Sequence, residues 1–111
     1  MLTKERKEKV VAALQKAIQA KSYSGEEKGV VEYLEKLFKD IGYDTVHIDH
    51  YGNIIGCIKG KKNGLKVLMD GHMDTVPVQE EKWKENAFGG EIKDEKIYGR
   101  GTSDMKGALI S

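Results

Sequence analysis

Two side chains that can bind a metal ion lie close together near the middle of the sequence. His72 and Asp74 stand two positions apart, directly after an apolar run at residues 67–69. In an extended backbone, residues two apart project from the same face. A neutral imidazole is a good zinc ligand, and a neighbouring carboxylate can accept the hydrogen bond of its other ring nitrogen. The spacing therefore favours a histidine ligand oriented by a carboxylate.

The same residues allow a second interpretation. Asp70 and Gly71 form a dipeptide that is typical of a tight hairpin turn between two strands. His72 and Asp74 would then be ordinary polar residues on a solvated face. The periodicity of the segment does not decide between the two interpretations, and both stay open on these residues alone.

A second segment with unusual composition lies near the end of the chain. Residues 98–107 contain three glycines and the carboxylate of Asp104. The glycine spacing fits neither the Walker pattern nor the dinucleotide-binding pattern. Asp104 stands where a helix is expected to begin, and a carboxylate is favoured there. Ser103 or Asp104 could thus serve simply as an N-cap, without any chemical role.

The apolar pattern predicts two helices in the first part of the chain. Apolar residues recur at spacings of three and four over about residues 3–20, which is typical of an amphipathic helix. A second helix is expected after a capping box formed by Ser24 and Glu27. Gly42 stands where this helix should end in a left-handed residue.

Strands are expected after the second helix. Residues 46–48 and 54–58 are strand-like and are separated by turn residues 51–53. The apolar run 67–69 suits a strand covered on both faces of an α/β sheet, and such sheets bind ligands beyond the carboxyl ends of their strands. Residues 77–90 predict a long loop, and residues 92–97 predict a hairpin.

The composition restricts the class of protein. The 111 residues are 39% hydrophobic and 33% charged, which fits one small globular domain. A net charge of +1 gives no electrostatic case for a nucleic-acid or membrane partner. Cys57, the single cysteine, cannot form an internal disulfide and is expected to fill the core. No signal peptide is recognisable, so we expect a cytoplasmic protein.

Taken together, the two polar segments resemble one known family. The residues G-H-M-D-T-V-P at 71–77, followed by Y-G-R-G-T-S-D-M-K-G at 98–107, are similar to those of a group of zinc aminoacylases and exopeptidases. This family includes acetylornithine deacetylase, succinyl-diaminopimelate desuccinylase and carboxypeptidase G. The resemblance covers nearly the whole chain.

The resemblance implies the fold. It predicts an α/β structure, with residues 1–111 forming the N-terminal part of an αβα zinc-exopeptidase-like catalytic domain that has a mixed sheet. The rest of that domain, and the lid or dimerisation domain, would lie beyond Ser111, so a truncated chain is expected. The family also implies that the full-length protein forms a homodimer.

The resemblance also implies roles for three residues. His72 would be a ligand of one zinc ion, and Asp74 the catalytic carboxylate that orients His72. Asp104 would bridge both zinc ions and precede a cis peptide bond to Met105. The family's general-base glutamate and its remaining ligands would lie beyond Ser111, and no residue is expected to bind an organic cofactor.

The activity that follows from the resemblance is metal-dependent hydrolysis of an amide bond. The substrate would be an N-acyl amino acid or a small peptide, attacked by water that two Zn²⁺ ions activate, with Co²⁺ or Mn²⁺ as alternative metals. The alternative hypothesis is a catalytically inactive fragment or interaction module with an incomplete metal site. The 111 residues alone are expected to be inactive.

Overall fold

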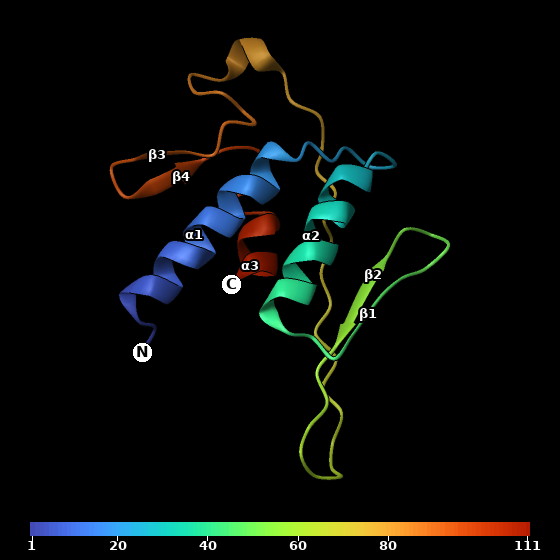
Figure 1. The fold of residues 1–111 in the computed structure, drawn as a ribbon. Coiled ribbons are helices and arrows are strands. Elements are labelled where there is room, and N and C mark those ends of the chain that lie inside the picture. The colour runs from blue at the N-terminus through green and yellow to red at the C-terminus, as the bar shows by residue number, and fades with distance from the viewer.

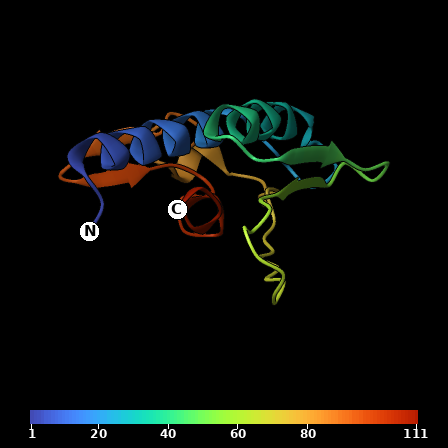
Figure 2. The same cartoon turned by 60° about the horizontal axis from the view of Figure 1, so that its bottom comes forward.

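Two long helices lie side by side in the computed structural model, which describes all residues 1–111 (Figure 1). Helix α1 spans Lys4–Gln19 and helix α2 spans Lys28–Ile41. Both helices are confirmed close to their predicted bounds. Figure 2 shows them in one layer, with the short helix α3 (Lys106–Ile110) lying beneath α1. No helix is long and apolar enough to cross a membrane.

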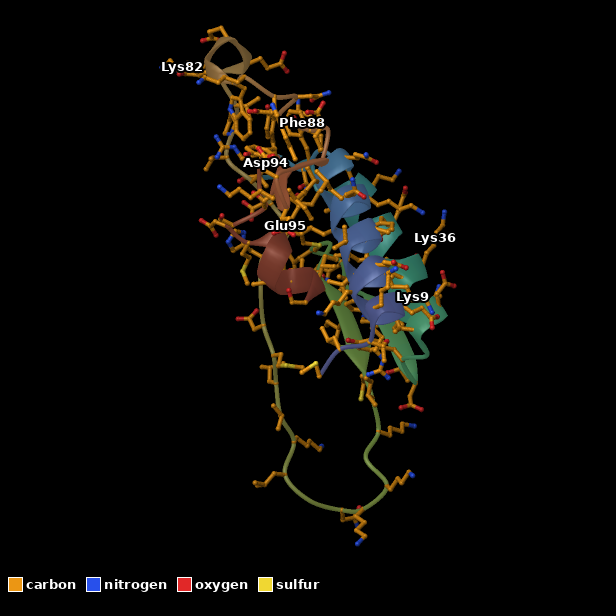
Figure 3. The ribbon with its side chains drawn as sticks, turned by 90° about the vertical axis from the view of Figure 1, so that its left-hand side faces the viewer. Lys9, Lys36, Lys82, Phe88, Asp94 and Glu95 are labelled. Atoms are coloured by element: carbon orange, nitrogen blue, oxygen red, sulfur yellow. The ribbon has the colours of Figure 1, made fainter.

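The sequence of each helix explains its ends and its buried face. Thr3 caps α1 by accepting a hydrogen bond from the Arg6 amide at 3.2 Å. Gly42 ends α2 with a left-handed φ of 95°, as predicted. The buried faces carry the main apolar core, which consists of Ala17, Ile18, Val30, Val31 and Leu34. Lys9 and Lys36 lie on the outer, solvated side of the helices (Figure 3).

The predicted capping box at the start of α2 is wrong. The residue before the helix is Glu27, and no side chain caps the helix amides. The Glu27 carboxylate instead accepts a hydrogen bond from the Gly25 amide at 2.7 Å. The Ser24 hydroxyl donates to the Asp74 carboxylate, far along the sequence. A charged acceptor forms a stronger hydrogen bond than a neutral one, which explains why the hydroxyl is used there.

Two separate antiparallel hairpins provide the strands. Strand β1 (Thr45–Ile48) pairs with β2 (Ile54–Cys57), and β3 (Glu91–Lys93) pairs with β4 (Lys96–Tyr98). Asp94 and Glu95 form the second turn, with φ values of 50° and 59°, and Figure 3 labels both. Positive φ at both central residues is what a type I′ hairpin turn requires. Both hairpins are confirmed predictions.

The first hairpin packs against α2 through a residue that has no side chain. The rings of Phe38 and Tyr43 stack with their centroids 4.5 Å apart. A Cβ atom on Gly56 would lie 2.5 Å from Tyr43 Cδ1 and 2.7 Å from Phe38 Cδ2, so only glycine fits beneath the rings. Cys57 faces the other way and is exposed, so its expected place in the core is wrong.

The strand predicted at residues 67–69 does not form. Val67, Leu68 and Met69 are 84%, 89% and 88% exposed, and no strand of the chain lies beside them. Residues 58–70 project away from the helices as an extended segment (Figures 1 and 2). A strand needs a neighbour to accept its backbone hydrogen bonds, and residues 67–69 lie beside neither edge of the β1–β2 hairpin. The alternative of a hairpin turn at Asp70 and Gly71 is not formed either.

The α/β fold class is confirmed. Antiparallel pairing occurs in both hairpins, and one isolated parallel bridge joins Tyr23 to Thr75. The long loop at residues 77–90 is also confirmed, with the short 3-10 helix η1 (Glu80–Lys82) inside it. Helix α3 begins after Met105, so neither Ser103 nor Asp104 is its N-cap.

Candidate metal centre

The three residues singled out by the sequence meet at one place. His72 Nδ1 lies 3.0 Å from Asp74 Oδ1, and His72 Nε2 lies 2.9 Å from Asp104 Oδ1. The imidazole therefore stands between two carboxylates from segments about thirty residues apart in the chain. All three side chains retain solvent access, so the cluster lies at the surface of this structure.

The segment that carries His72 is attached to the loop between the two long helices. The buried Ser22 hydroxyl donates to the Met73 carbonyl at 2.7 Å. The Thr75 amide donates to the Ser22 carbonyl, also at 2.7 Å. These bonds flank the parallel bridge between Tyr23 and Thr75. Residues 72–75 therefore have a fixed register against residues 22–24, although they belong to no regular sheet.

Hydrogen bonds set the charges of the cluster. The Ser24 hydroxyl donates to Asp74 Oδ2 at 2.5 Å, and this bond is the main cause that lowers the pKa of Asp74. The carboxylate of Asp104 is the main cause that raises the pKa of His72, and contacts with Asp74 act in the same direction. Without metal, these contacts favour the imidazolium form of His72 and the ionised form of Asp74.

The other side of the cluster is attached to helix α1. The peptide bond between Asp104 and Met105 is cis, as the family resemblance led us to expect. The next residue, Lys106, is buried, and its ammonium donates to the carbonyls of Ala17 and Ala20 at 2.8 Å each. Burial lowers the pKa of Lys106 to about 8. Lys106 therefore anchors the residues after Asp104 to the carboxyl end of α1, where carbonyls lack partners within the helix.

Close backbone packing joins the two motifs. A Cβ atom on Gly101 would lie 2.9 Å from Thr75 Cγ2, and Gly101 has a φ of 89°. The His72 amide donates to Met105 Sδ at 3.3 Å. Gly71 is similarly close, since a Cβ atom there would lie 3.0 Å from Met105 Cε. Glycine at these positions lets the His72 segment and the Asp104 segment approach each other.

The geometry fits part of a zinc site. Two ligands of one tetrahedral zinc ion, each bound at about 2.0–2.2 Å, lie roughly 3.3–3.6 Å apart. His72 Nε2 and Asp104 Oδ1 are 2.9 Å apart, at hydrogen-bonding distance, so a separation wider by roughly half an ångström would let both atoms bind one ion. Asp74 contacts the other ring nitrogen, which is the usual place of a carboxylate that orients a histidine ligand. No group of three or more His, Cys, Asp or Glu side chains is arranged to hold a metal ion.

Sequence reasoning missed the residues that support the cluster. Ser24 was interpreted as a helix cap, and Ser22 and Lys106 were given no role. Lys106 lies inside the glycine-rich motif, so its position was a usable signal. No local signal marked Ser24 as a support of the cluster, because its partner Asp74 lies 50 residues away. The Trp83 ring packs against Arg100, whose Cζ atom lies 5.3 Å from the ring centroid.

Comparison with known proteins agrees with these motifs. The sequence profile of "Peptidase family M20/M25/M40" matches residues 68–111, which include all three residues of the cluster. A protein of Escherichia coli (strain K12) described as "Uncharacterized protein YgeY" is 42% identical over 91 residues, covering 81% of this chain and 22% of its own length.

Two further relatives have names that describe an activity. A "Putative LysW-lysine/LysW-ornithine hydrolase" of Pyrococcus furiosus is 34% identical over 104 residues, covering 94% of this chain and 28% of its own length. A "Succinyl-diaminopimelate desuccinylase" of Wolinella succinogenes is 31% identical over 107 residues, covering 95% of this chain and 28% of its own length. The chain thus spans about a quarter of the length of the curated relatives it matches.

The matched residues include both motifs that form the cluster, and the relatives cover most of the chain. Over residues 68–111 this chain matches peptidase family M20/M25/M40, and its similarity to the relatives extends over most of its length.

Proposed function

We propose that these residues form part of the active site of a zinc-dependent amidohydrolase. The observation that carries the proposal is the placement of His72 between Asp74 and Asp104, within the residues that match the family. His72 Nε2 and Asp104 Oδ1 would hold the metal, and Asp74 would orient the imidazole. When bound, zinc polarises a carbonyl group and lowers the pKa of a water molecule.

The three residues do not include a general base. Asp74 already accepts hydrogen bonds from Ser24 and His72, and Asp104 is proposed as a metal ligand. Proton transfer from water to the leaving amine therefore requires another residue. A second zinc ion, bridged to the first by Asp104, would also require further ligands, because this structure offers too few donors for a closed site.

We propose an N-acyl amino acid or a small peptide as the substrate. One relative is named a desuccinylase and another a hydrolase, and these names support removal of an acyl group. We also propose a cytoplasmic location, because a single cysteine cannot form an internal disulfide. Neither a nucleic acid nor a membrane is proposed as a partner, given the net charge of +1.

Metal removal and reconstitution test the proposed activity. The whole protein that carries these residues is stripped with a chelator, reloaded with Zn²⁺ and assayed for amine release from N-acetyl and N-succinyl amino acids and dipeptides. We expect no turnover without metal, recovery with Zn²⁺ or Co²⁺, and loss in His72→Ala. Turnover that survives the chelator, or an active His72→Ala variant, would refute the assignment.

A second candidate applies to the 111 residues taken alone. The absence of any group of three metal-ligating side chains favours an inactive module with an incomplete site. We propose that this polypeptide on its own does not hydrolyse N-acyl amino acids. Zinc-dependent turnover by the purified 111-residue chain would contradict this second proposal.

A further inference from the structure

We infer that Ser24 is a positioning residue for the metal centre, acting through Asp74 on the orientation of His72. The inference rests on the proposed function, because it assumes that His72 is a metal ligand. It adds a residue from the loop between α1 and α2, which lies outside the residues that match the family profile.

The two oxygens of Asp74 have different partners. Oδ2 accepts the hydrogen bond of the Ser24 hydroxyl at 2.5 Å, and Oδ1 lies 3.0 Å from His72 Nδ1, which also lies 3.1 Å from the Asp74 carbonyl oxygen. A carboxylate bonded through one oxygen can still turn about its Cβ–Cγ bond. A second bond, through the other oxygen, stops this rotation and fixes the direction of the acceptor for the imidazole.

The series of contacts continues from the His72 imidazole to Asp104, the proposed ligand on the other segment. His72 Nε2 lies 2.9 Å from Asp104 Oδ1, so the two proposed ligands already face each other at hydrogen-bonding distance. A change in the angle of the Asp74 carboxylate therefore alters the direction in which Nε2 points. Ser24 influences the site through this sequence of contacts without touching the metal.

The backbone around Ser24 holds the hydroxyl in place. The bridge between Tyr23 and Thr75, and the bond from the Thr75 amide to the Ser22 carbonyl, fix the register of the two segments. Ser22 and Ser24, two residues apart, each donate a side-chain bond to the facing segment. On the other side, Gly25 adopts a φ of 86°.

A structural role in the helix does not explain Ser24. The residue before α2 is Glu27, and the Ser24 hydroxyl makes no bond to the amides of that helix. Its side chain is exposed and adds nothing to the apolar core. The hydroxyl has one polar partner in the structure, and that partner is Asp74.

Cobalt binding and the absorption spectrum test the inference without relying on turnover. The metal-stripped protein and its Ser24→Ala and Ser24→Thr variants are titrated with Co²⁺, and the d–d bands are recorded. Loss of an outer partner of a metal site typically weakens binding by about 10- to 100-fold. We expect Ser24→Ala to weaken Co²⁺ binding by about 10-fold, which is the lower limit of this range, and to alter the d–d bands.

The other variants separate positioning from general destabilisation. Ser24→Thr keeps a hydroxyl and should restore binding to within about twofold of the unmodified protein. Ser111→Ala is the matched control, since it removes an exposed hydroxyl that bonds only to the Gly107 carbonyl at 2.7 Å. In an Asp74→Asn background, Ser24→Ala should add no further loss, because both changes act through the same carboxylate.

The outcomes distinguish this inference from the proposed function. Unchanged Co²⁺ affinity and spectrum in Ser24→Ala, no recovery in Ser24→Thr, or a full additional loss in the Asp74→Asn background would each overturn the role of Ser24. Tight Co²⁺ binding by the whole protein that carries these residues, without hydrolysis of any N-acyl amino acid, would refute only the proposed function. An unmodified protein that binds no Co²⁺ would overturn both.

Discussion

The central residue of the cluster is an imidazole whose two nitrogens both face carboxylates. The motifs predicted the three members of the cluster, and the structure places the His72 ring nitrogens 3.0 Å from Asp74 and 2.9 Å from Asp104. Ser24 could not be predicted as their neighbour. A serine three residues before a glutamate indicates a capping box in the local sequence. The partner that Ser24 bonds instead, Asp74, is brought close only by the folding of the chain.

The charge of His72 makes metal binding depend on pH. Asp104 raises the pKa of His72 above its ordinary value of 6.5, and a metal ion needs the neutral ring. Below the raised pKa, a proton must leave for each metal bound, so affinity should rise about tenfold per pH unit and level off above it. Isothermal titration with Zn²⁺ over this range measures the slope.

An exposed histidine elsewhere in the chain provides the control for this prediction. His47 lies in β1, on the exposed face of the first hairpin. The His47→Gln variant should show the same pH dependence as the unmodified protein. An affinity that does not change with pH through the pKa of His72 would argue against His72 as a ligand.

At the scale of elements, periodicity predicted those parts of the fold that depend on local sequence. Helices α1 and α2 and both hairpins agree with their apolar patterns and turn residues. The prediction of a strand at residues 67–69 was wrong. An apolar run indicates a preference for burial, but it does not specify which strand would pair with it. The start of α3 was also misplaced, since Asp104 contacts His72 instead of capping the helix.

The contact between β2 and α2 should be sensitive to a single methyl group. Gly56→Ala places a Cβ atom 2.5 Å from Tyr43 Cδ1 and 2.7 Å from Phe38 Cδ2, where atoms cannot approach so closely. Overpacking of this kind costs about 1–3 kcal/mol, so the free energy of unfolding should fall by that amount. Urea denaturation of the metal-free protein measures the change.

Gly29, which lies on α2, serves as the control for the Gly56→Ala substitution. A Cβ atom on Gly29 would meet nothing within 4 Å, and alanine is the better helix former. Gly29→Ala should leave the free energy of unfolding unchanged or raise it by up to about 1 kcal/mol. Equal effects of the two substitutions would show that β2 does not pack on α2 as described.

At the scale of the whole molecule, the apolar core is small and much apolar surface is exposed. Only 12 of 111 residues are buried, and the flattened molecule measures 52 × 37 × 21 Å. The extended segment at residues 58–70 carries Leu65, Val67, Leu68 and Met69, each at least 84% exposed. An extended apolar segment with unpaired backbone groups is prone to pair with another chain.

We therefore expect the 111-residue chain to self-associate through this segment. Leu68→Glu places a charge at a position that is 89% exposed and should shift the chain toward monomer. Sedimentation velocity measures the change over a range of concentrations. Gln79→Glu, which adds the same charge at an exposed position in the long loop, should leave association unchanged. Equal effects of both variants would indicate that net charge, and not the segment, controls association.

The proton NMR spectrum of the Co²⁺-loaded protein tests the role of His72 most directly. We expect one strongly shifted, exchangeable Nδ1–H resonance from a histidine bound through Nε2, with its N–H directed at Asp74. This resonance should be absent in His72→Gln and altered in Asp74→Asn. A spectrum without such a resonance, or one in which it persists in His72→Gln, would contradict the assignment of His72 as a metal ligand oriented by Asp74.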